Sequence, residues 1–323
     1  MGPKILKSSL PAFKSNFLKS DSAVSVAIGA AMLLAIGVIF ITTIQVYHVP
    51  QWIEDAEYAH MSEVLEDMSR FKCEMDFLST GMEVNPDARI LLNSPLRMGG
   101  GYIPVIKRMK SGGTLSFDPE GCRMSVNVLA NVTYTGNLTN ESCSRTLDCG
   151  AISYKSENSY YLDQLFCYEN GALIVVQDDL SFLKLSPGIT LNKTSDTTNL
   201  TSGTAPNILN LNINAISIDS SSFVLSSNSL EDIRMLSGSR KTLYNIKGRE
   251  SFYNINSVSL TIFTDYPKAW EAYFNDIANE ANCQNTDYTC ASNSSAVVFS
   301  LHPDEKLEVN IYESVIKVDP MSR

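Results

Sequence analysis

The pattern of apolar and polar residues separates an apolar N-terminal segment from a long, mixed remainder. The 22 residues from Ala23 to Ile44 contain no charged side chain. As a helix they would span about 33 Å, the thickness of the hydrocarbon core of a bilayer. A cleaved secretory signal has an apolar stretch of only about 7–15 residues. We therefore predict a transmembrane helix over residues 24–49, with a cleaved signal or a buried core helix as the alternatives.

The charges that flank this segment predict its orientation. Residues 1–23 form a basic leader with four lysines, whereas acidic residues follow the apolar segment closely. A lysine bias of this kind keeps the N-terminus in the cytoplasm. We predict a single-pass protein of the cell membrane whose C-terminal part lies outside, at the cell surface. The lysines are Lys4, Lys7, Lys14 and Lys19.

A second helical pattern covers residues 50–81, where apolar residues recur at alternating intervals of three and four. This spacing predicts an amphipathic helix that ends near Gly81. Its stripe consists of Met61, Val64, Met68, Phe71, Met75 and Leu78. We predict a stalk helix continuous with the membrane span. Two interpretations of the stripe stay open: a core helix packed on its own globular domain, or a helix–helix seam between subunits.

The remainder, 82–323, is predicted to be one β-rich extracellular domain. Apolar residues alternate with polar ones from Cys122 to Tyr134, which is typical of a half-buried strand. Asn170-Gly171 predicts a tight hairpin turn. In the segment Leu209–Ile218 the alternation changes phase at Ile216, which predicts a bulge. Other strands are expected at Tyr160–Tyr168, Ala172–Gln177, Val258–Phe263, Val297–Leu301 and Leu307–Val318.

One further helix is predicted among these strands, with Asp265 as its N-cap and Pro267 in its first turn. Trp270, Phe274 and Ile277 follow at helical spacing and should lie against a sheet. The expected fold class is α+β: a transmembrane helix, a stalk helix, and a mostly antiparallel, sandwich-like domain with one packed helix.

Net charge and the motifs that the sequence lacks argue against several classes of function. The formal net charge is -10 and no basic stripe is present, so the sequence argues against a nucleic-acid partner. The chain contains no G-x-S-x-G, no H-E-x-x-H, no P-loop and no calcium-loop pattern. We therefore expect no catalytic activity and no cofactor. The three histidines are scattered and no C-x-x-C pair exists, so no metal site is expected.

All seven cysteines fall beyond the apolar segment, on the side predicted to be oxidising. Cys143 with Cys149, and Cys283 with Cys290, are spaced like short disulfide-closed loops in turn-rich sequence. We predict these two pairs, although seven cysteines leave the connectivity open.

Six sequons make the same part of the chain a candidate for N-glycosylation. Their number alone does not distinguish an extracellular protein from any other, because a chain so rich in asparagine, serine and threonine contains several sequons by chance. They begin at Asn131, Asn137, Asn140, Asn192, Asn199 and Asn293.

The stretch "SAVSVAIGAAMLLAIGVIFITTI" resembles the processing and polymerisation segment of archaeal type IV pilin-like proteins. The resemblance implies that a prepilin-type peptidase cleaves between Ala23 and Val24, and that identical or related subunits are partners. Gly29 and Gly37 would give the small surfaces on which such helices pack. The stretches "PLRMGGGYIPVIKRMKSGGTLSF", "YKSENSYYLDQLFCYENGALIVVQ" and "SLTIFTDYPKAWEAYF" also look like uncharacterised, pilin-like archaeal surface proteins.

Two classes of function follow. One is a membrane-anchored, pilin-like surface protein with a structural, assembly or adhesion role, such as a minor or tip subunit of a filament. The other is a single-span anchored ectodomain that does not polymerise and binds a ligand, a glycan or an envelope partner.

Overall fold

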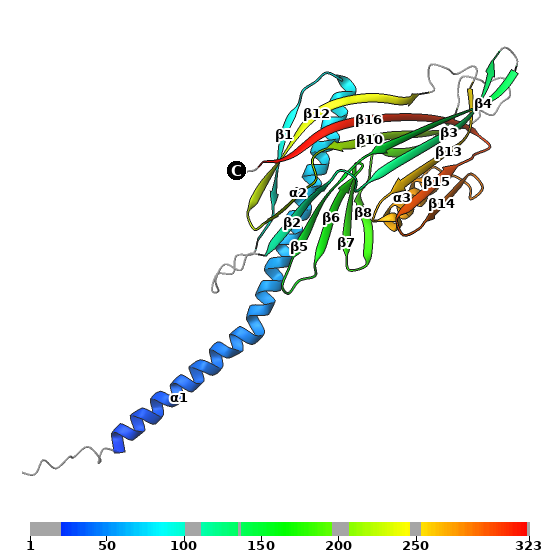
Figure 1. Cartoon of the computed structure of the whole chain (residues 1–323). Helices are drawn as coiled ribbons and strands as arrows, with labels where there is room; N and C mark the ends of the chain where they lie inside the picture. Colours follow the sequence, from blue (N-terminus) through cyan, green and yellow to red (C-terminus); the bar gives the residue numbers. More distant parts are fainter. Residues whose placement is uncertain (1–20, 101–110, 135–136, 196–206, 246–252, 322–323) are drawn as a thin grey trace, which may run out of the picture. The chain divides into compact units, whose positions relative to one another are not determined.

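The structure is a computed structural model that describes residues 21–100, 111–134, 137–195, 207–245 and 253–321. The chain forms two compact units, Met1–Trp52 and Ile53–Arg323, here called the helical unit and the head. Figure 1 labels the helices and strands of both.

The helical unit contains α1 (Asp21–Thr43), a single π-helical turn η1 (Ile44–His48) and the first residues of α2 (Val49–Val84). In the π-turn the backbone N–H of Val49 donates to the carbonyl oxygen of Ile44, five residues earlier. Pro50 has no N–H to donate, so a local change of helical hydrogen bonding ahead of it is expected. Every described residue from 21 to 84 is nevertheless helical, as the predicted continuity of the two helices requires.

From Ile53 onward, α2 is a core helix of the head. All six residues of the predicted apolar stripe are buried among strands of the head, together with Met82. The interpretation as a seam between subunits is therefore wrong for this stripe, and residues 50–81 are not a separate stalk. The spacing of the apolar residues could not show whether the stripe packs on the same chain or on another subunit, because the same three–four pattern suits any apolar partner. The helix also passes Gly81 and ends at Val84, ahead of Asn85-Pro86.

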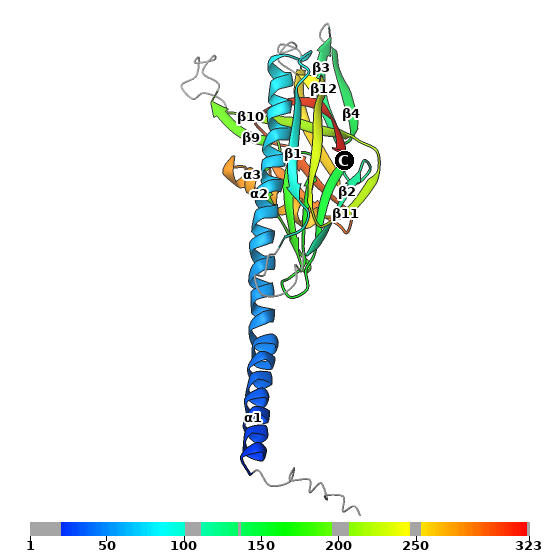
Figure 2. The ribbon, with the colours of Figure 1, turned by 90° about the vertical axis from the view of Figure 1, so that its left-hand side faces the viewer.

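Three sheets and one short helix, α3 (Pro267–Glu280), make up the other regular elements of the described head (Figure 2). Sheet A has the order β1-β12-β16-β10-β9, with β1 (Leu91–Arg97), β9 (Ile189–Ser195), β10 (Asn207–Asp219), β12 (Leu230–Asn245) and β16 (Lys306–Met321). Sheet B has the order β11-β2-β5-β6-β7-β8, with β2 (Gly112–Asp118), β5 (Ala151–Glu157), β6 (Gln164–Glu169), β7 (Ala172–Gln177), β8 (Leu180–Leu185) and β11 (Phe223–Ser227). Sheet C has the order β14-β15-β13-β3-β4, with β3 (Arg123–Tyr134), β4 (Asn137–Asp148), β13 (Tyr253–Phe263), β14 (Tyr288–Ser292) and β15 (Ala296–Leu301).

The described strand pairs are antiparallel with one exception, β10 beside β16, which is parallel. The predicted fold class, α+β with mostly antiparallel strands, is thus confirmed.

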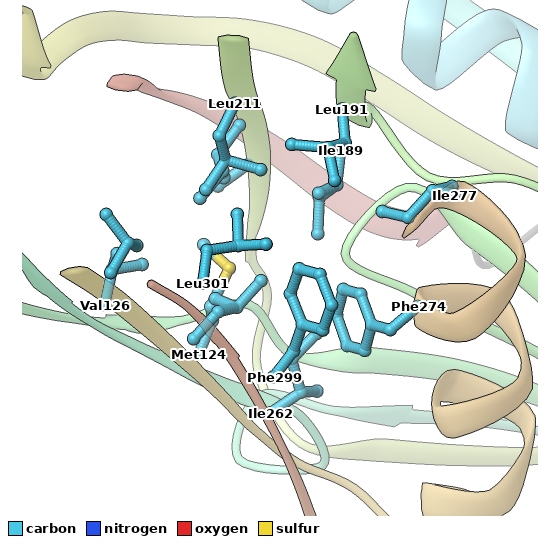
Figure 3. Close-up of a cluster of buried hydrophobic side chains, with 14 of the residues drawn as sticks. Met124, Val126, Ile189, Leu191, Leu211, Ile262, Phe274, Ile277, Phe299 and Leu301 are labelled. Carbon is cyan, nitrogen blue, oxygen red and sulfur yellow. The ribbon is translucent and has the colours of Figure 1, made fainter. Parts of the chain in front are cut away.

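Two hydrophobic cores divide the head between them. The first lies between sheet C, the first halves of β10 and β16, and helix α3 (Pro267–Glu280). Figure 3 shows Phe274 of α3 facing Phe299 of β15 in this core, and the two rings stack with centroids 4.9 Å apart. The second core lies between α2, sheet B and the second halves of β10 and β16.

These two cores explain the change of phase in β10. Leu211 and Ile213 point into the first core, whereas Ile216 and Ile218 point into the second. The register of β10 with β16 and with β9 runs without a shift, so the predicted bulge is wrong. The strand buries one face in its first half and the opposite face in its second half.

Two local predictions can be compared directly with the structure. Asn170 and Gly171 both have positive φ, 45° and 78°, and close the hairpin between β6 and β7 as predicted. Helix α3 forms where expected, but Asp265 is not its cap. The residue before Pro267 is Tyr266, which makes no side-chain capping hydrogen bond.

Candidate functional site

The apolar surface of α1 is the first candidate site. None of its most apolar stretch is buried in the structure, and its large side chains are exposed from Val24 to Ile41. The hydroxyls of Thr42 and Thr43 donate to carbonyl oxygens four residues earlier, at 2.8 Å each. These bonds satisfy the polar groups inside the helix, which suits an environment without water.

Small residues interrupt this apolar surface. A Cβ added at Gly29 or at Gly37 would meet no atom within 4 Å, so both positions are open for a neighbouring helix. Val24, the predicted first residue after cleavage, is exposed, and Ala23 lies in the first turn of α1.

Aromatic residues mark the end of this surface. The rings of His48 and Trp52 stack with centroids 6.1 Å apart, and Tyr47 is exposed beside them in the sequence. Tryptophan and tyrosine favour the boundary between a bilayer and water. Their place after the apolar residues fits a helix that leaves a membrane here.

In the head, a buried carboxylate joins α2 to β1. Asp67 is 1% exposed and accepts hydrogen bonds from the Arg97 guanidinium at 2.8 and 2.7 Å, from the Arg97 backbone N–H at 3.0 Å, and from Arg70 at 2.7 Å. Burial alone would raise the pKa of Asp67, but these bonds lower it below its usual value. The pair fixes where α2 sits on sheet A.

A second acid of α2 holds the loop that follows β5. Glu57 accepts the backbone N–H groups of Ser159, Tyr160 and Tyr161 at 2.7, 2.9 and 2.8 Å. The side chain is buried, and these three donors satisfy both of its oxygens. Neither acid was identified from the sequence, because an acid beside an apolar stripe is usually solvent-exposed.

A buried group of thiols and one carboxyl lies at the edge of the first core. Cys122, Cys149 and Cys167 are each at most 2% exposed, and Glu169 beside them is 1% exposed. Glu169 accepts hydrogen bonds from Thr264 Oγ1 at 2.6 Å and from Trp270 Nε1, both on Oε1. Oε2 has no partner among the described residues. Burial raises the pKa of Glu169 to about 7 against the opposing effect of these two donors.

The two predicted disulfides are not present, since all seven cysteines are free thiols in the structure. Cys143 lies inside β4 and Cys149 just beyond its end. Six residues of extended strand span about 20 Å, whereas a disulfide needs Cα atoms about 4.4–6.8 Å apart. The Cys143–Cys149 prediction is therefore wrong.

Cys283 and Cys290 are also separated. The backbone N–H of Cys283 donates to the Ala278 carbonyl oxygen, whereas Cys290 Sγ lies 3.9 Å from the Glu271 carbonyl oxygen. Seven helical residues separate these two acceptors by about 10 Å. The Cys283 backbone and the Cys290 thiol therefore contact α3 at different turns.

Three of the six glycosylation candidates lie at exposed positions on edge strands or in a turn. Asn140 on β4, Asn192 on β9 and Asn293 in the turn before β15 are exposed. Asn131 lies inside sheet C, is only half-exposed, and accepts a hydrogen bond from Asn256 at 2.7 Å. Asn137 begins β4, and Asn199 lies outside the described residues.

A polar groove of about 370 Å³ lies between β3, β4 and the end of β12. Glu141, Arg145 and Asn245 are among the residues that line it. In the part of the chain that the structure describes, no group of histidine, cysteine and acidic side chains could hold a metal ion.

Comparison of the chain with protein-family models, with curated proteins and with solved structures finds no match. Among the described residues, one helix is long and apolar enough to cross a membrane, and it begins at Val24.

Proposed function

We propose that this protein is a membrane-anchored, pilin-like surface protein of an archaeon, with a structural, assembly or adhesion role outside the cell. The observation that carries the proposal is the unburied apolar stretch of α1, in a chain whose head already buries its own cores. Such a surface needs either lipid or other apolar helices around it. The proposed role is a minor or tip subunit of a filament.

The proposed orientation places the leader in the cytoplasm and the head outside, where the exposed sequons would be glycosylated. A prepilin-type peptidase would cut between Ala23 and Val24. Cleavage would remove four lysines and Asp21, and would change the formal net charge from -10 to -13. A lysine cluster at the inner face resists extraction of the helix from the bilayer, so cleavage would release α1 to pack with identical or related helices.

The test is the intact mass of the protein isolated from the cells that make it. We expect a mature chain that begins at Val24. Ala23→Glu should abolish processing because a prepilin-type site needs a small residue, and the matched variant Ala23→Gly should be processed normally. A mature protein that begins at Met1 or Gly2 would contradict the pilin-like proposal.

The second candidate is an anchored ectodomain that does not polymerise. The groove beside β4 and β12 favours it, because an acid and an arginine in one hollow suit a small polar ligand or a glycan. An unprocessed N-terminus would favour this candidate over the first.

A further inference from the structure

Cys122 and Cys149 stand opposite each other at the open end of the β3–β4 hairpin. The two strands pair from Tyr134 with Asn137 to Arg123 with Asp148, and the cysteines follow directly outside this last pair, one at the start of β3 and one at the end of β4. The backbone continues this pairing, since the Cys149 N–H donates to the Cys122 carbonyl oxygen at 2.9 Å. The Gly150 N–H donates to the same oxygen at 3.0 Å.

The side chains of the pair point to the same side of sheet C. Both belong to the first core, with exposed fractions of 1% and 0%, and Cys149 Sγ lies 3.9 Å from the Leu147 carbonyl oxygen. Residues directly opposite in antiparallel strands have Cα atoms about 4.5–5.5 Å apart, which lies inside the range of a disulfide. The expected Cα separation of the pair therefore suits a disulfide.

The third thiol of the group has a different partner. Cys167 comes from β6, in sheet B, where it stands opposite Ser153 of β5 and Ile174 of β7. Cys143 is further away, because it pairs with Val128 in the middle of the hairpin. Of the four cysteines in this region, Cys122 and Cys149 are therefore the two that are placed to form a disulfide.

We propose that Cys122 and Cys149 form a disulfide that closes the β3–β4 hairpin, and that Cys167 stays a thiol. The two thiols lose two protons and two electrons. The oxidant is a disulfide of the glutathione or thiol–disulfide oxidoreductase class, which is reduced to two thiols by exchange. The choice of this cysteine pair does not depend on the proposed function. Only the compartment in which the disulfide forms rests on it.

The bond would form while the chain folds. In the folded head both sulfurs are buried, and the neighbouring Cys149 thiol, together with burial, raises the pKa of the Cys122 thiol well above its usual value. A thiol in this state exchanges slowly. Once formed, the disulfide would be shielded from reductants in the same way.

The first experiment is cell-free synthesis of the full chain into detergent micelles, in a glutathione redox buffer that contains a thiol–disulfide oxidoreductase. Free thiols are then alkylated, and the protein is digested with trypsin without reduction. Trypsin separates the cysteines of interest, because Arg123, Arg145 and Lys155 lie between or after them. We expect peptide 111–123 linked to peptide 146–155, and the linked form to be two hydrogen atoms lighter than the sum of the two free peptides.

Matched variants make the result specific. Cys122→Ser and Cys149→Ser should each abolish the linked peptide, whereas Cys73→Ser, at an exposed position of α2, should leave it unchanged. Reduction should lower the Tm of the wild type by about 5 °C, and should not change that of the double variant Cys122→Ala/Cys149→Ala. Linkage of peptide 124–145 to peptide 146–155, linkage of Cys122 to Cys167, or seven free thiols in the folded protein would each overturn the proposal.

A second experiment separates this proposal from the proposed function. Protein from the cells that make it is alkylated during lysis and mapped in the same way. A bond found in the cell-free protein and absent from the cellular protein would support the pairing and contradict an oxidising location for the head.

Discussion

At the scale of single residues, two of the buried carboxyls of the head, Asp67 and Glu169, have opposite surroundings. Asp67 has four hydrogen bonds from two arginines and is held in its charged form. Glu169 has two neutral donors and one oxygen without a described partner. Burial therefore dominates for Glu169 and favours its protonated form.

This difference predicts how stability depends on pH. The pKa of Glu169 is about 7 in the folded protein, whereas its ordinary value, which applies to the unfolded chain, is 4.5. At pH values between these two, the unfolded state therefore binds fewer protons than the folded state. The free energy of unfolding should consequently fall as pH rises from about 4.5 to 7, by about 3 kcal/mol. Glu169→Gln should remove this fall, as measured by urea unfolding of the full chain in detergent at several pH values.

The exposed Glu120→Gln is the matched control and should keep the wild-type slope. Burial lowers the pKa of His60, so this residue makes the free energy of unfolding rise with pH below pH 6.5. This contribution is the same in the wild type, Glu169→Gln and Glu120→Gln. An equal slope in the wild type and Glu169→Gln would show that Glu169 is ionised in the folded state.

At the scale of elements, residue patterns predicted those structures whose cause is local. The alternation in β3, the Asn170-Gly171 turn and the spacing in α3 depend on neighbours in sequence, and they form as expected. The pairing of Cys122 with Cys149 and the two faces of β10 depend on which elements meet in space. For the same reason the spacing in α2 left two interpretations open, of which the core helix packed on its own domain is the one the structure confirms.

The role of α2 can be tested with two phenylalanines of this helix, one buried and one exposed. Phe71 is 1% exposed and its ring meets that of Tyr168 edge-on at 5.3 Å, whereas Phe77 is 59% exposed. Phe71→Ala should lower the free energy of unfolding of the head by about 4 kcal/mol because it leaves a cavity. Phe77→Ala should change it by less than about 0.5 kcal/mol. Equal, small effects in thermal or urea unfolding would mean that α2 does not belong to the core.

At the scale of the whole molecule, the proposed topology predicts which reagents reach the head. Cys73 on α2 is exposed, so a membrane-impermeant maleimide added to intact cells should label it. Cys73→Ser should remove that labelling, and permeabilised cells provide the control for total protein. Labelling of the wild type only after permeabilisation would place the head in the cytoplasm.

The parallel pair of β10 and β16 also affects how the protein is made. Residues that pair across it, such as Asn212 and Asn310, are 98 positions apart, and β16 lies between β12 and β10 in the middle of sheet A. Both cores include residues of β16, so neither can close before the ribosome has produced this strand. Pairings this distant in sequence also form slowly. The head would therefore remain unfolded during synthesis, in the state that a narrow export channel can accept.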